Sequence, residues 1–186
     1  MGLREEKKAK TKKRISDLAT GLFIKKGFAN VTVAEIAQKA EVSVPTLFNY
    51  FPTKESFVFD EDEEREKSFI DAILHRKKGT SILDALQEHV LKSSAFIPEY
   101  LQNYQSFREL IKSTPELSNY ERLILMRYEK SLADILQKES SRKLQRTQAE
   151  AIAHFLLDAF YRAIDSSNPK ATLVSLFKMI REGWNE

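Results

Sequence analysis

Residues 32–55 read TVAEIAQKAEVSVPTLFNYFPTKE, and this stretch decides the fold. Thr32, followed three residues later by Glu35, is a capping box and predicts a short helix over residues 33–40. The next three residues form a break, whose last member, Ser43, can cap a second short helix that runs to about residue 50. Two short helices joined by so tight a break are typical of a helix-turn-helix.

An amphipathic helix precedes this pair. Its apolar residues follow the helical repeat from Ile15 to Phe23, and Gly27 is the expected stop. The three helices together need small or apolar side chains where they cross. The sequence supplies these at Ile36, Ala37, Ala40, Val42, Leu47 and Phe51.

In a helix-turn-helix the last helix enters the major groove of DNA with its N-terminus first. Short apolar, hydroxyl and amide groups on its outer face suit contacts with thymine methyl groups, base edges and phosphates. A lysine at the next helix start can hold a phosphate. The predicted DNA-binding residues are Thr32, Ser43, Val44, Pro45, Thr46, Asn49, Tyr50 and Lys54. The alternative is a three-helix packing unit with no DNA role.

Over about residues 10–58 the sequence resembles the DNA-binding domain of the TetR family of bacterial transcription regulators, most specifically in the block Tyr-Phe-Pro-Thr-Lys-Glu at 50–55. The resemblance implies a homodimer on a near-palindromic operator, released by a small ligand. It also implies phosphate contacts by Thr32, Tyr50 and Lys54. Glu41 and Pro45 stand where the family often has glycine.

Charge separates two parts of the 186-residue chain. Residues 1–54 hold 11 Lys or Arg against 5 Asp or Glu, whereas residues 55–186 hold 19 against 22. A basic segment on an acidic body is typical of nucleic-acid binding. We therefore predict a DNA-binding domain over 1–53 and a ligand-binding and dimerisation domain over 54–186. The basic tail up to Arg14 is expected to be an arm, either solubilising or in contact with DNA.

Only 5 glycines and 5 prolines occur, and most of them fall where helices should begin or end. We expect an all-α fold of about nine helices. Beyond residue 53 the predicted helices cover about 54–77, 81–96, 98–113, 115–136, 147–164 and 169–184. The first of these would join both domains and act as the lever between them.

Several classes of function are excluded by composition. With no Cys, no His-x-x-x-His pair and no glycine-rich phosphate loop, we expect neither an enzyme nor a metal or cofactor site. No apolar run or signal segment predicts membrane association, so a cytoplasmic protein is expected. The acidic run at 60–64 is interpreted as a solvated face. Residues 57–63 resemble a TetR subgroup that includes regulators sensing long acyl-thioesters.

The helix over 149–164 is apolar nearly all round, with one polar stripe of residues four apart. Such a helix must be covered on more than one side. A partner subunit packing on this helix and the last one would make a four-helix dimer interface. The alternative is a helix buried in one large core. The predicted interface residues are Ile152, Phe155, Leu156, Ala159, Phe160, Leu173, Leu176, Phe177 and Ile180.

A ligand pocket lined by aromatic and apolar side chains with one cation would suit an amphipathic anion, such as a fatty-acyl compound or an aromatic acid. The predicted pocket residues are Phe69, Ile73, Phe96, Tyr100, Tyr104, Phe107, Arg108, Met126 and Tyr128. The alternative is plain core packing, with Arg108 paired to an acid. The expected function is thus a ligand-responsive regulator, against a ligand-independent or architectural DNA-binding protein, or an adaptor that binds no DNA.

Overall fold

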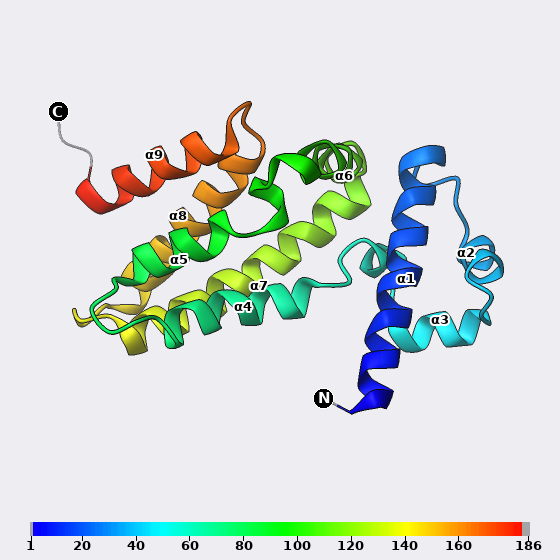
Figure 1. Cartoon of the computed structure of the whole chain (residues 1–186), viewed down its shortest axis with the longest axis horizontal. Helices are drawn as coiled ribbons and strands as arrows, with labels where there is room; N and C mark the ends of the chain where they lie inside the picture. The colour runs from blue at the N-terminus through cyan, green and yellow to red at the C-terminus, as the bar shows by residue number, and fades with distance from the viewer. Residues whose placement is uncertain (1, 184–186) are drawn as a thin grey trace. The chain divides into compact units, whose positions relative to one another are not determined.

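The computed structural model describes residues 2–183 of the chain. Over that range the chain forms nine α-helices, three short 3-10 turns and no strand, so the all-α prediction is confirmed (Figure 1). The helices are α1 (Leu3–Lys26), α2 (Val33–Lys39), α3 (Val44–Tyr50), α4 (Asp62–Leu74), α5 (Ile82–Leu91), α6 (Leu101–Ser113), α7 (Pro115–Glu139), α8 (Arg146–Ile164) and α9 (Pro169–Glu182). The 3-10 turns cover Glu55–Phe57, Ser94–Phe96 and Pro98–Tyr100.

The chain folds as two compact units. The first runs to Glu63 and also takes Ser106–Glu121, while Glu64–Gln105 and the chain from Arg122 onward form the second. Our sequence-based division falls at residue 53 and assigns no later segment to the first part. The last turns of α6 and the first turns of α7 join the first unit because Leu110, Ile111 and Leu117 share its core.

The core of the first unit gathers apolar side chains from α1, α2, α3 and the segment that follows α3. Phe23, Leu47 and Phe51 are buried at its centre, and Phe57 packs its ring against that of Phe51 at 4.5 Å between centroids. The other buried members from these segments are Ile15, Ala19, Phe28, Val31, Ile36, Ala37, Ala40 and Val58.

The long helix predicted over 54–77 is wrong, because α4 begins only at Asp62. A single 3-10 turn, Glu55–Phe57, forms there instead, and the N–H of Ser56 within it donates to Thr53 Oγ1 at 3.3 Å. Two carbonyls that a continuing helix would need are then taken by α1: Ser16 Oγ donates to Phe57 O at 2.8 Å, and Lys12 Nζ donates to Asp60 O. No single helix therefore starts at Lys54, and the proposed lever does not exist in that form.

Other helix boundaries differ by less. The N-terminal tail is helical from Leu3 rather than an extended arm, as its Lys, Arg, Glu and Ala residues favour. The helix predicted over 81–96 ends at Leu91, and the one over 98–113 opens with a 3-10 turn. Asn168 caps α9 as predicted, with its side chain accepting the N–H of Ala171 at 3.2 Å. The expected end of that helix near 184 lies outside the described residues.

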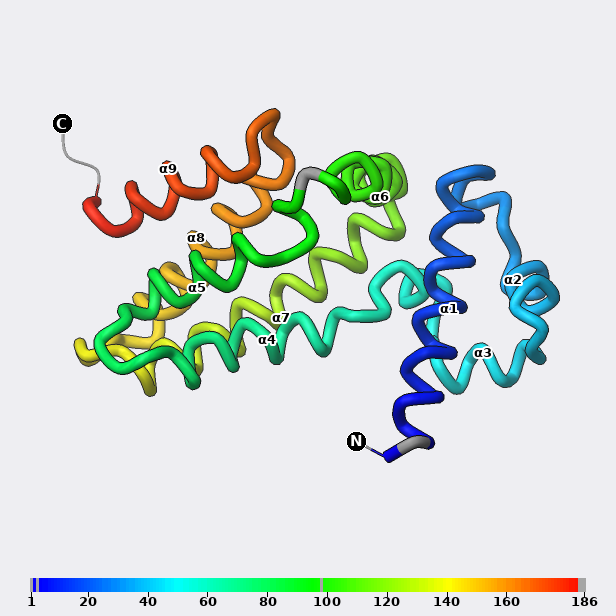
Figure 2. The backbone as a smooth tube through the Cα atoms, in the orientation of Figure 1, coloured from blue at the N-terminus to red at the C-terminus, as the bar shows by residue number. Residues whose placement is uncertain are grey.

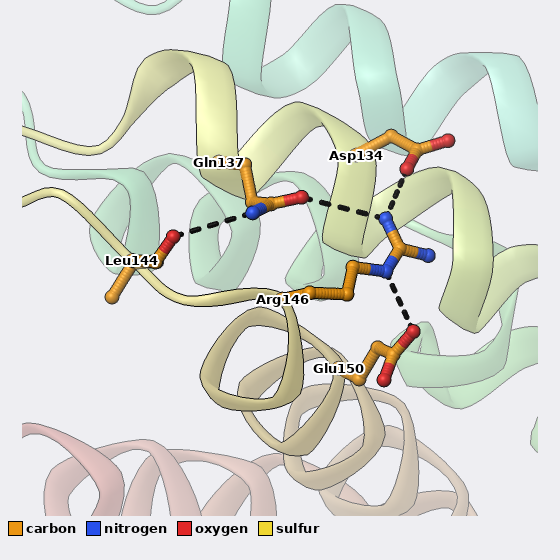
Figure 3. Close-up of polar contacts among 5 residues, drawn as sticks. All are labelled: Asp134, Gln137, Leu144, Arg146 and Glu150. Carbon is orange, nitrogen blue, oxygen red and sulfur yellow. Dashed lines mark hydrogen bonds and ion pairs between the residues drawn. The ribbon is translucent and has the colours of Figure 1, made fainter.

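The second unit packs α9 against both α8 and α5 (Figure 2). At the start of α8, Arg146 ties this helix to α7: its Nε donates to Glu150 at 2.6 Å and its Nη1 bonds Asp134 (Figure 3). These hydrogen bonds raise the pKa of Arg146 above its ordinary value. Gln137 extends the network to the carbonyl of Leu144 at 3.2 Å. Within residues 2–183 no helix combines the length and apolar character needed to cross a membrane.

Candidate nucleic-acid interface

Two side-chain caps set the start of α2 and of α3. Thr32 Oγ1 accepts the N–H of Glu35 at 3.1 Å, and Ser43 Oγ accepts the N–H of Thr46 at 3.2 Å. Each cap satisfies one of the free N–H groups at a helix start, so the chain enters both helices where its sequence predicts. The Ser43 hydroxyl also lies 2.7 Å from the hydroxyl of Thr46.

The turn between α2 and α3 passes through a left-handed residue. Glu41 has φ +57°, and the N–H of Val42 returns to the carbonyl of Ala37 at 3.0 Å. From outside the pair, Arg14 on α1 donates to the carbonyl of Ala40 at 3.1 Å. The turn is therefore held by α1 as well as by the buried contacts of the two helices.

The outer face of α3 is open to solvent. Leu47 is fully buried and anchors the helix, whereas Pro45 and Asn49 on the opposite side are exposed. Thr46 is half-buried beside them. Hydroxyl and amide groups on an exposed helix face, with a capped N-terminus, are what a major groove requires of a recognition helix.

Two of the predicted DNA-contacting residues, Val44 and Tyr50, are half-buried and pack against the core of the first unit. Phe48, which our sequence analysis did not include, is 48% exposed on the same helix. The sequence pattern could have predicted this exposure, because Phe48 directly precedes Asn49 and lies away from Leu47 on a helical wheel. An aromatic ring there adds an apolar surface beside the polar groups of α3.

Lys54 is engaged within the first unit. Its Nζ donates to the carbonyl of Phe28 at 2.6 Å and lies 4.3 Å from the centroid of the Phe28 ring. Burial lowers the pKa of its ammonium group. An ammonium has three N–H donors, so a phosphate contact by Lys54 stays a prediction, but the side chain also fixes the turn between α1 and α2.

The structure divides the predicted ligand-pocket residues. In the second unit the rings of Phe69 and Phe96 contact that of Phe160, with centroids 5.9 and 6.0 Å away, and the ring of Tyr128 contacts that of Phe69 at 6.3 Å. Ile73 is fully buried in the same unit. The remaining pocket residues of that unit are less enclosed: Tyr104 is half-buried, and Tyr100 and Met126 are exposed.

Arg108 and Phe107 belong to the first unit instead. Arg108 is buried and its Nη1 donates to Glu121 at 2.5 Å, so this cation already has a carboxylate. The ring of Phe107 meets that of Phe59, with centroids 6.5 Å apart. Arg108 and Phe107 therefore fit the alternative prediction, in which these side chains pack in the core and Arg108 pairs with an acid. No three His, Asp or Glu side chains among the described residues gather closely enough to hold a metal ion.

The predicted dimer-interface residues fall into two groups. Five are buried in the chain's own core and are unavailable to a partner: Leu156, Ala159, Phe160, Leu173 and Phe177. Ile152, Leu176 and Ile180 are half-buried, and Phe155 is 60% exposed. The error arises because a helix that is apolar all round does not show by its pattern which side faces its own core. Val174 and Met179 on α9 are exposed apolar residues that were not predicted.

Comparison with known proteins points to one family. A model of bacterial regulatory proteins of the tetR family matches residues 15–60. The mycofactocin biosynthesis regulator MftR, as it is named in Mycobacterium tuberculosis, is 23% identical over 151 residues, 81% of this chain and 76% of MftR. YvkB, a helix-turn-helix regulator of Bacillus subtilis, is 48% identical over 48 residues, 26% of this chain and 25% of YvkB.

The whole fold is shared as well. The TetR family repressor FadR of Thermus thermophilus, solved in complex with lauroyl-CoA, superposes with a TM-score of 0.61 at 21% identity, covering 94% of this chain and 95% of FadR. A capped helix-turn-helix with an exposed face on its last helix is the arrangement found in DNA-binding proteins of the helix-turn-helix class. Over residues 15–60 the chain is thus similar to the tetR family of bacterial regulatory proteins, and over its whole length it has the fold of a solved member of that family.

Proposed function

We propose that the protein is a homodimeric repressor that binds an inverted-repeat operator and is released by a small apolar or amphipathic ligand. Two copies of α3 would enter successive major grooves, about 34–36 Å apart. The ligand would bind in the second unit and favour a dimer with a different spacing. Since bacterial DNA lies in the cytoplasm, we expect the protein there.

The observation that carries the DNA-binding part is the open face of α3. Pro45 and Asn49 project from a helix whose other side is anchored by the buried Leu47. The amide of Asn49 can pair with a base edge, adenine above all, which few other side chains on this helix could do.

Selection from a library of randomised duplexes, followed by sequencing, tests this proposal. We expect the full chain to enrich an inverted repeat. Asn49→Ala should weaken binding to the enriched duplex by about 5–150-fold, the worth of one good base contact. Asn103→Ala, which removes an exposed amide on α6, is the matched control and should bind as the unmodified chain does. Failure to enrich any sequence would contradict the proposal.

Dimerisation is proposed through the outer sides of α8 and α9. Phe155 on α8, with Val174 and Met179 on α9, exposes large apolar surface on two helices that pack against each other. Large apolar side chains left exposed on a single chain are candidates for contact with a partner. Ile152, Leu176 and Ile180 stay in the proposed interface as its half-buried members.

The ligand part is proposed for the aromatic cluster of Phe69, Phe96, Tyr128 and Phe160. Apolar, aromatic walls of this kind suit an acyl chain or an aromatic ring. Because Arg108 pairs with Glu121, it would have to leave that carboxylate before it could bind an anionic group. We therefore leave Arg108 out of the proposed site.

Lauroyl-CoA, the ligand in the FadR structure, is the first probe. We expect it to release the full chain from its enriched duplex in a dose-dependent manner, with free coenzyme A as the control that lacks the acyl chain. Release by laurate but not by lauroyl-CoA would point to a free acid as the ligand. If no acyl or aromatic compound releases the DNA, the chain is a ligand-independent DNA-binding regulator and this part of the proposal is wrong.

A further inference from the structure

The first turns of α1 stand apart from the core of their unit. Arg4 to Lys10 are all exposed, and the first fully buried side chain after them is Ile15. About two helical turns therefore extend beyond the packed part of the helix. Because these exposed side chains do not pack in the core, the fold does not require their charges, and another role can account for them.

Two lysines on these turns lie on the same side of α1 as Arg14. With about 100° of rotation per residue, Lys7 lies about 20° and Lys10 about 40° from the direction of Arg14. Arg4 and Glu6 lie about 80° away on either side and Lys8 about 120° away, whereas Glu5 points to the opposite side. Glu5 is used locally, since its carboxylate accepts the N–H of Gly2 at 3.2 Å.

Ion pairing separates the early cations from the later ones. Lys12, Lys13 and Arg14 each have a partner in the first unit: the carbonyl of Asp60, the carboxylates of Asp17 and Glu61, and the carbonyl of Ala40. In contrast, within the described chain no acidic side chain pairs with any of four cations on the exposed turns, Arg4, Lys7, Lys8 and Lys10.

The side of α1 that carries Lys7, Lys10 and Arg14 faces the helix-turn-helix. Arg14 reaches the carbonyl of Ala40, the residue just before the turn between α2 and α3. Lys10 and Lys7 continue the direction of Arg14 toward the N-terminus, about 6 and 10.5 Å further along the helix axis. Figure 1 shows that these turns of α1 extend past α3.

We propose that the first turns of α1 form a second DNA contact, in which Lys7 and Lys10, flanked by Arg4 and Lys8, bind backbone phosphates beside the bases that α3 contacts. This inference rests on the proposed function. Lysines bind phosphate as point charges and release counterions from the DNA, so the contact is independent of sequence and depends strongly on salt.

The test compares the full chain with the double variant Lys7→Ala/Lys10→Ala, because alanine preserves the helix. Affinity for the enriched duplex and for a shuffled duplex is measured by fluorescence anisotropy over a range of salt concentrations. Each lost phosphate contact lowers the salt slope by about 0.9, so we expect a drop of about 1.8. Affinity for both duplexes should fall by the same factor, and the melting temperature should not change.

The matched control is Lys77→Ala/Lys78→Ala, which removes the same charge from an exposed loop of the second unit. It should leave the slope unchanged. A double variant at Lys7 and Lys10 with the slope of the unmodified chain overturns the inference while the proposed function stands. Altered sequence preference would instead indicate base reading by this segment and overturn the phosphate assignment. A chain that binds neither duplex contradicts the inference and the proposed function together.

Discussion

Glu41 is the one non-glycine residue of the described chain with a left-handed backbone, at φ +57°. A side chain in this conformation places its Cβ too close to the following carbonyl, at a cost of about 1–2 kcal/mol. Three hydrogen bonds hold the turn in this conformation and offset the cost. The N–H groups of Glu41 and Val42 donate to carbonyls of α2, and Arg14 donates to the carbonyl of Ala40.

Replacing Glu41 by glycine should therefore stabilise the first unit. We expect Glu41→Gly to raise the free energy of unfolding by about 0.5–1 kcal/mol, since the relief of strain exceeds the entropy that glycine loses on folding. Glu41→Ala keeps the Cβ and should bring no such gain. Urea unfolding of both variants is the measurement, and equal stability of the two would show that no strain is stored at this turn.

His89 is a titratable group held inside the second unit. Its Nε2 lies 3.2 Å from Ser68 Oγ, and its ring meets the edge of Phe69 with centroids 5.5 Å apart. Burial first, and then the charge of Lys92, lower the pKa of this imidazole. Between the lowered pKa and the ordinary value of 6.5, the unfolded chain binds more protons than the folded one.

It follows that His89 contributes stability above its unfolded pKa, and that this contribution is lost as the pH falls through 6.5 toward the lowered folded pKa. His89→Gln keeps a hydrogen-bonding side chain but cannot titrate. We expect the melting temperature of this variant to fall less between pH 7 and pH 5 than that of the unmodified chain. The same pH dependence in both would remove His89 as the cause.

Two phenylalanines of α8, five positions apart, separate core from surface. Phe160 is 5% exposed and meets the rings of Phe69 and Phe96, whereas Phe155 is 60% exposed. Periodicity alone does not distinguish them, because both are large apolar residues on a helix with little polar surface.

For this reason Phe155 is the residue that tests the dimer. We expect Phe155→Glu to yield a folded monomer by sedimentation velocity, with a melting temperature for the monomer fold that changes little. Phe160→Glu buries a charge in the aromatic cluster and should destabilise the fold by several kcal/mol. A Phe155→Glu variant that stays dimeric would place the interface elsewhere.

Local signals in the sequence predicted the parts of the fold that local physics determines. Thr32, Ser43 and Asn168 cap their helices as expected, since a cap depends on residues only three positions away. The prediction of one helix over 54–77 was wrong because its outcome depends on contacts with residues far away in the sequence. Its break depends on Ser16 and Lys12, which are distant in sequence and take the carbonyls of Phe57 and Asp60.

The candidate sites also differ in whether neighbouring residues or long-range packing determine the positions of their side chains. The exposed face of α3 could be predicted because one buried residue, Leu47, fixes the orientation of a short helix. The arrangement of the predicted pocket residues could not be predicted in this way, since they come from α4, α6, α7 and two 3-10 turns, whose packing no local pattern reports. Arg108 illustrates this: Glu121, its partner, lies on the next helix, 13 positions away.

At the scale of the whole molecule, the basic N-terminal segment lies within the first unit, together with acidic residues that follow it in the sequence, so the two units do not divide the chain by charge. The first unit carries the helix-turn-helix and the cationic turns of α1, and the second carries the aromatic cluster and the exposed sides of α8 and α9. Sequence-specific DNA binding by the first unit is the central claim, because every other proposal depends on it.

The most direct test is the ratio of two affinities at physiological salt: that of the full chain for its enriched inverted repeat, and that for a shuffled duplex of equal length and composition. Base contacts by α3 predict a ratio of at least about 10³. Equal affinity for the two duplexes would mean that the chain binds DNA only through its charge, and would contradict the assignment of α3 as a recognition helix.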